Sequence, residues 1–137
     1  MKVEDKILLI KDLSSRLPYG VYVEHIRTGM RGCLHDLKVY PLYDKTDDHI
    51  YDYICSTDFL GDGDYFDIEA FKPLLFPISS MTDEQRKIYH ELIGGMFGTS
   101  ALINFEVLEV LFYKNHIDFR GFIEKGLAID ATGKNVY

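Results

Sequence analysis

The sequence predicts one α+β domain over residues 1–137, with an N-terminal helix, a small curled antiparallel β-sheet and two to three helices after it. The length fits one hydrophobic core rather than two. Hydrophobic residues make up 47% of the chain and charged residues 27%, so the chain can bury that core. Helical and alternating apolar periods occupy separate parts of the chain instead of interleaving, which disfavours a parallel α/β sheet.

The first helix is indicated by apolar residues that recur at spacings of three and four from Val3 to Leu17. Acidic residues in its first turn and Arg16 in its last turn match the helix dipole. Because Pro18 disfavours helical backbone at the residue before it, we expect the helix to run from about Val3 to Arg16.

The predicted sheet follows in a segment from Tyr19 to Ile68 that is rich in tyrosine, valine and isoleucine. Three turn clusters divide this segment into strands near 20–27, 32–43, 49–56 and 65–68. Pro41 fits such a sheet at an edge or a bulge, because proline cannot donate to the hydrogen-bond ladder. Four or five short strands suggest a small curled sheet, with a partly closed SH3-like barrel as its shape.

An extended segment and two helices are predicted next. Two prolines argue against a helix in residues 71–78. Thr82 and Gln85 form a capping box for a helix over 83–93, and a glycine pair ends it. A further apolar stripe predicts a helix over 104–115.

A short last helix is predicted over 119–125. Asp118 is placed to cap its N-terminus. Gly126 follows it as a left-handed stop, and Leu127 supplies the apolar residue that often accompanies such a stop.

The net charge of −7 is concentrated in one segment. Nine acids and one base lie between Asp44 and Glu69, so this segment carries −8 and the rest of the chain +1. The acids are Asp44, Asp47, Asp48, Asp52, Asp58, Asp62, Asp64, Asp67 and Glu69, and the base is Lys45. Such a segment repels phosphates, which disfavours nucleic acid as a partner and favours a basic protein surface.

The leading hypothesis is therefore a non-enzymatic accessory or protein-interaction module that presents an acidic, tyrosine-rich surface. Tyrosine is enriched in protein interfaces, and the chain contains no recognisable catalytic signature. The candidate partner-binding residues are Asp47, Asp48, Tyr51, Tyr53, Asp62 and Asp64.

Two alternatives stay open. The first is an enzyme of unrecognised type that uses His116 or the region of Cys33 and Cys55, since a histidine near an acid or a thiol is a common catalytic arrangement. Asp118, two residues after His116, is already expected to cap a helix. The second alternative is a small-barrel nucleic-acid binder, which the expected sheet shape alone suggests.

No metal and no cofactor are predicted. Four aspartates crowd the loop from Asp58 to Asp67, and oxygen-rich loops of this kind can bind calcium. The spacing departs from the EF-hand pattern, because Asp67 falls where that loop requires glycine. Cys33 and Cys55 lack the close pairing of a structural zinc site.

A cytoplasmic location is expected. The early apolar run, Ile7 to Ile10, is short and follows two acids, unlike a signal peptide. No stretch approaches the roughly 20 apolar residues of a membrane span. The two cysteines are then expected to be free thiols in a reducing compartment.

Three blocks carry a resemblance to a known family. They are Ile7–Gly20 (ILLIKDLSSRLPYG), Lys72–Gln85 (KPLLFPISSMTDEQ) and Asp118–Asp130 (DFRGFIEKGLAID). The chain resembles a family of uncharacterised small proteins of gut anaerobic bacteria and of their phages and mobile elements. This resemblance implies one shared fold and a cytoplasmic, prophage-borne accessory role, and it implies no catalytic residue.

Overall fold

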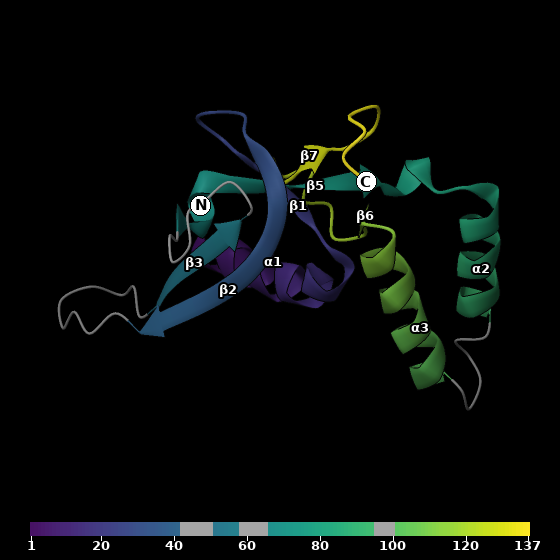
Figure 1. Cartoon of the computed structure of the whole chain (residues 1–137). Coiled ribbons are helices and arrows are strands. Elements are labelled where there is room, and N and C mark those ends of the chain that lie inside the picture. The colour runs from purple at the N-terminus through teal and green to yellow at the C-terminus, as the bar shows by residue number, and fades with distance from the viewer. Residues whose placement is uncertain (42–50, 58–65, 95–100) are drawn as a thin grey trace. The chain divides into compact units, whose positions relative to one another are not determined.

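The computed structural model of the chain describes residues 1–41, 51–57, 66–94 and 101–137 (Figure 1). The chain forms two compact units, unit 1 (Met1–Leu74 together with Tyr137) and unit 2 (Leu75–Val136). The arrangement of helices and strands is α+β, as predicted, and the single domain stays a prediction.

Helix α1 (Val3–Arg16) opens unit 1 and has the bounds that the sequence predicts. Its first turn carries two acids and its last turn Arg16, which suits the dipole of the helix. Leu9 and Leu13 have no exposed surface, so α1 packs through the face that these two residues share.

The strands of unit 1 are β1 (Tyr22–His25), β2 (Arg31–Pro41), β3 (Tyr51–Thr57), β4 (Phe66–Asp67) and the first part of β5 (Phe71–Pro77). Their described pairs are antiparallel and follow the order β4-β3-β2-β1-β5, which confirms the predicted antiparallel sheet. Strand β2 is long and curved (Figure 1), and its register shifts between Leu34 and Asp36, as a β-bulge does. Closure into an SH3-like barrel stays a prediction.

The core of unit 1 lies between α1 and the strands. Besides the two leucines of α1, its buried apolar residues are Val21, Val23, Leu34, Ile68, Phe71 and Leu74. These side chains come from β1, β2, β5 and the chain next to them, so one helix and the antiparallel strands share a single apolar layer.

Unit 2 is mainly helical. Its elements are the second part of β5, helices α2 (Asp83–Gly94) and α3 (Ala101–Lys114), and the short strands β6 (Ile117–Asp118) and β7 (Ile129–Asp130). The predicted capping box is present, because Thr82 N–H donates to Gln85 Oε1 (2.9 Å) and Gln85 N–H to Thr82 Oγ1 (3.1 Å). Met81, Leu108, Phe112 and Ile117 form the buried core of this unit.

One strand pair departs from the purely antiparallel prediction. Strands β5 and β6 pair in parallel, with Phe76 opposite Ile117 and Pro77 opposite Asp118. The chain between them consists mainly of α2 and α3, and a helical crossover of this length returns the chain in the same direction.

The predicted helix over 119–125 is wrong, since these residues form turns. Gly121 has φ +72°, a left-handed conformation that an α-helix cannot contain, so helical backbone cannot continue through it. The predicted stop is present, whereas Asp118 binds a turn in place of a helix. Asp118 accepts hydrogen bonds from the chain that follows, and Leu127 N–H donates to Phe122 O (2.8 Å) across a left-handed Gly126.

Gly126 provides a test of this stop. Its φ is +71°, and a Cβ added there would meet no atom within 4 Å, so the cost of Gly126→Ala is the left-handed backbone alone. We expect a loss of about 1 kcal/mol in the free energy of unfolding, measured by denaturant titration. Gly94→Ala is the matched control, because Gly94 also has open space and no left-handed φ. If Gly126→Ala and Gly94→Ala had equal free energies of unfolding, the left-handed stop at Gly126 would be contradicted.

Candidate functional site

The predicted partner-binding residues fall in and around β3. Tyr51 lies opposite Pro41 and Tyr53 opposite Val39, so the two tyrosines occupy alternate positions and the same face of β3. Asp47, Asp48, Asp62 and Asp64 lie outside the described residues.

We call residues 38–41 of β2 and 51–53 of β3 the distal arm. The described pairs of the neighbouring strands do not reach this arm, since β1 pairs with residues 31–33 of β2 and β4 with residues 54–55 of β3. In Figure 1 the hairpin of β2 and β3 runs away from β1. Both tyrosines are therefore carried on an extension of the sheet.

The C-terminal end of the acidic segment is tied to α1. Lys6 Nζ lies 3.5 Å from Asp67 Oδ1 and 3.6 Å from Glu69 Oε1. Both acids are nearly half exposed, so each pair contributes little to stability. The contact instead changes the local charge, because Lys6 partly neutralises Asp67 and Glu69, the two acids that it contacts. The other seven acids precede these two in the chain.

The two cysteines are not placed to act together. Cys55 lies opposite Leu37 on β2, which is four residues along that strand from Cys33. Four residues of extended strand span roughly 13 Å, whereas a disulfide or a shared metal ion needs far closer sulfurs. Cys33 is of intermediate burial, and its Sγ lies 3.8 Å from Leu34 O.

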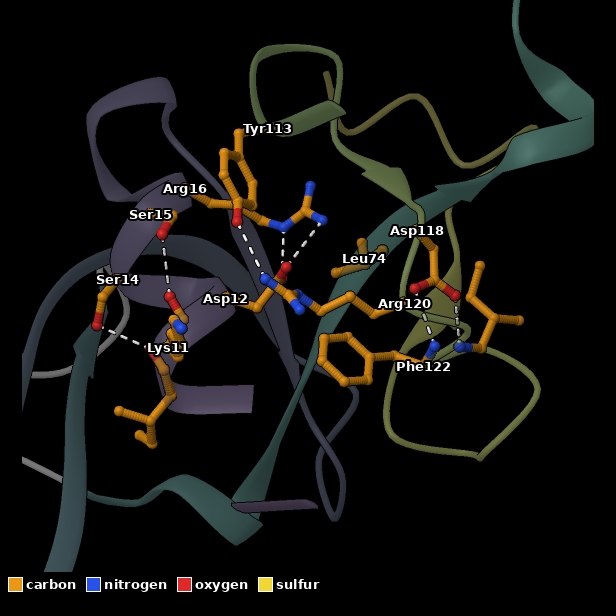
Figure 2. A network of polar contacts seen from close by, with 12 residues as sticks. Lys11, Asp12, Ser14, Ser15, Arg16, Leu74, Tyr113, Asp118, Arg120 and Phe122 are labelled. Carbon is orange, nitrogen blue, oxygen red and sulfur yellow. Dashed lines mark hydrogen bonds and ion pairs between the residues drawn. The ribbon is translucent and has the colours of Figure 1, made fainter. Parts of the chain in front are cut away.

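His116 and Asp118 have structural contacts in unit 2. His116 is 7% exposed and lies two residues after the end of α3, with φ +55°, and its carbonyl accepts a hydrogen bond from Phe76 N–H (2.8 Å). Each carboxylate oxygen of Asp118 accepts a backbone N–H, Oδ1 from Phe122 (2.8 Å) and Oδ2 from Ile123 (2.7 Å) (Figure 2). Asp118 therefore organises the next turn, although the helix that it was predicted to cap does not form.

Arg120, close to this turn, is also bound to neighbouring residues. Its Nη2 donates to the Tyr113 hydroxyl (3.2 Å), and its guanidinium carbon lies 4.7 Å from the centre of the Phe119 ring. Phe119 in turn stacks on Phe112, with 4.8 Å between ring centres. The arginine thus holds an aromatic cluster on the surface of the unit 2 core.

A buried ion pair in α1 was not predicted. Arg16 Nε lies 2.6 Å from Asp12 Oδ2 and its Nη2 3.3 Å from Oδ1, and both side chains are completely buried (Figure 2). A signal existed in the sequence, because positions 12 and 16 fall on the same helical face as Leu9 and Leu13. Oppositely charged residues four positions apart on a helix usually pair on its surface. The spacing alone therefore does not predict that this pair is buried.

Tyr137 is the second buried polar contact that sequence reasoning missed. Its hydroxyl accepts a hydrogen bond from Tyr22 N–H (3.0 Å) and donates one to Leu74 O (2.7 Å). Its ring meets that of Tyr22 edge to face, with 5.5 Å between centres. Burial of the hydroxyl raises the pKa of Tyr137 above its usual 10, and the hydrogen bond from Tyr22 and the charge of Arg16 oppose this only in part.

Among the described residues, no group of three or more histidines, cysteines, aspartates and glutamates is arranged to hold a metal ion. The helices described here include none that is long and apolar enough to cross a membrane. Comparison with protein families, with curated proteins and with solved structures finds no match to this chain.

Removing one partner of the buried pair should be costly. We expect Asp12→Ala to lose about 3–5 kcal/mol of unfolding free energy, because the Arg16 charge stays buried without its carboxylate. Glu24→Ala is the matched control, since Glu24 and Arg31 form a pair of the same 2.6 Å length that is partly exposed and is worth at most about 1 kcal/mol. Denaturant titration measures both. A small loss in both variants would mean that water reaches Asp12.

Tyr137 predicts a stability change at alkaline pH. Because its pKa is raised on folding, its stabilising effect is complete below about pH 10 and is lost as the pH rises toward the folded pKa. Tyr137→Phe removes this titration but keeps the ring. We expect the wild type to have the higher melting temperature at pH 8, and the difference between the two to narrow at about pH 11. A difference in melting temperature that stays the same from pH 8 to about pH 11 would contradict a buried, neutral hydroxyl at Tyr137.

Proposed function

We propose that the protein is a non-enzymatic interaction module that binds a basic protein surface through the distal arm and the acidic stretches on either side of β3. The supporting observation is the position of β3 in the chain. Residues 44–48, with three acids, precede it, and residues 58–64, with three acids, follow it. Tyr51 and Tyr53 lie between these stretches, on one face of the strand.

The chemistry of such a surface favours a cationic partner. Clustered carboxylates raise the encounter rate with a basic surface, and they repel nucleic acid. Tyrosines on the same strand add large contact areas at low cost in conformational entropy. In this proposal the acids govern the rate of association, whereas the tyrosines govern the lifetime of the complex.

The buried polar side chains of the described part of the chain support a binding role more than a catalytic one. Asp12 is bound to Arg16, and Asp118 accepts two backbone N–H groups. Both carboxylates thus have structural roles. The enzyme and the small-barrel nucleic-acid binder stay predictions.

We also propose a cytoplasmic location and an accessory role of the prophage-borne kind. The location rests on the sequence, which has a short early apolar run after two acids and no stretch of membrane-span length. The accessory role rests on the resemblance of the three sequence blocks alone.

The test compares two variants with the same net charge. The acid variant carries Asp47→Asn, Asp48→Asn, Asp62→Asn and Asp64→Asn, which changes the net charge from −7 to −3. The control variant carries Glu4→Gln, Glu91→Gln, Glu106→Gln and Glu124→Gln at exposed positions elsewhere and makes the same change. Each protein is immobilised and exposed to bacterial cytosolic extract, and captured proteins are then purified for kinetics.

For a basic protein captured by the wild type, we expect the acid variant to associate about tenfold more slowly at low salt than the control variant. The association rates should converge as salt is added, because ions screen the acidic stretches. Tyr51→Ala with Tyr53→Ala should mainly raise the dissociation rate. Equal binding by both charge variants would contradict the proposal. If the protein retards nucleic acid in a gel shift at low salt, the result would favour the small-barrel nucleic-acid binder instead.

A further inference from the structure

The contact of Tyr137 with β1 and β5 replaces one hydrogen bond of a β-ladder. In the register of these strands the last pair is Val23 with Pro73, so the next pair would be Tyr22 with Leu74. Alternate pairs of an antiparallel ladder exchange hydrogen bonds. Ile26 N–H donates to Ala70 O (2.9 Å), which places the pair of Tyr22 and Leu74 in the hydrogen-bonded set.

The two groups that such a pair would join are instead joined by a hydroxyl. Tyr22 N–H donates to Tyr137 Oη at 3.0 Å, and Tyr137 Oη donates to Leu74 O at 2.7 Å. At this point the hydroxyl of Tyr137 links the two strands in place of the direct hydrogen bond. We call Tyr22 N–H, Leu74 C=O and the ring of Tyr22 the fork.

The fork sets strict chemical requirements on whatever fills it. The occupant must accept one hydrogen bond and donate another from the same atom, which a hydroxyl does and a carboxylate or an ammonium group does not. The edge-to-face contact with Tyr22 favours an aromatic ring beside that hydroxyl. These requirements together describe a phenol.

We propose that the fork is a binding site for a phenolic group, that Tyr137 is its occupant within the chain, and that the site accepts a phenol from outside when Tyr137 is absent. Tyr137 keeps 44% of its surface exposed, so the residue that fills the fork lies at the surface of unit 1. Only the neutral phenol fits, because a phenolate cannot donate to Leu74 O. The raised pKa of Tyr137 agrees with this. The proposal does not depend on the acidic surface.

The test is a chemical rescue of Tyr137→Ala in the full chain. We expect p-cresol, the tyrosine side chain as a free molecule, to bind this variant with a dissociation constant of about 1 mM. At about 10 mM it should raise the melting temperature of the variant by roughly 5 °C. Toluene, which has the same shape without the hydroxyl, should have a much smaller effect.

The controls locate the binding. Neither wild type nor Tyr137→Phe should respond to p-cresol, because a ring already fills the site. Tyr19→Ala is the matched control, because it removes a partly exposed tyrosine of the same unit and leaves Tyr137 in the fork. It should not respond to p-cresol either. In Tyr137→Ala, the amide NMR signal of Tyr22 should shift on addition of p-cresol, and the rescue should disappear at about pH 11, where p-cresol, like tyrosine, is ionised.

A second probe distinguishes the source of the phenol. Tighter binding of N-acetyltyrosinamide than of p-cresol would indicate a tyrosine of another polypeptide, and the reverse order a free phenol. Equal effects of p-cresol and toluene, or none, would overturn the proposal. If Tyr137→Ala is unfolded alone, refolding with p-cresol and not with toluene supports the site, and failure with both contradicts it.

Discussion

The buried ion pair of Asp12 and Arg16 constrains the packing of unit 1. Two charges without exposed surface are tolerated only when each is held by the other in good geometry, and the double contact of carboxylate and guanidinium provides this. Because the pair shares a helix face with Leu9 and Leu13, it fixes which side of α1 turns inward. Burial of the strands against that face then follows from the apolar residues around it.

The sequence predicts the features that depend on neighbouring residues. The bounds of α1, the capping box of Thr82 and the left-handed Gly126 come from local signals and are confirmed. The failed helix depends on Gly121, because glycine adopts left-handed backbone as readily as right-handed backbone and Gly121 lies inside the predicted helix rather than at its end. Tyr137 could not be foreseen either, because its hydrogen-bond partners are 63 and 115 residues away in the chain.

The candidate site shows the same division between local and distant information. Composition alone locates the acids and tyrosines along the chain, but only the strand register shows that Tyr51 and Tyr53 share a face and that Cys33 and Cys55 are apart. The contact of Lys6 with Asp67 could not be predicted, because it needs α1 and the end of the acidic segment to meet. A charge pattern in the sequence thus suggests the kind of partner before the fold is known. A site formed by residues that are distant in the sequence can be recognised only from the fold.

The return of Tyr137 to unit 1 has a consequence for biosynthesis. Unit 1 receives its last residue only after all of unit 2, residues 75–136, has been made. At about 5–20 residues per second the ribosome needs roughly 3 to 12 s for that stretch. During this interval Tyr22 N–H and Leu74 C=O of the nascent unit 1 lack the Tyr137 hydroxyl as a hydrogen-bond partner. The two units mature in an interleaved order rather than one after the other.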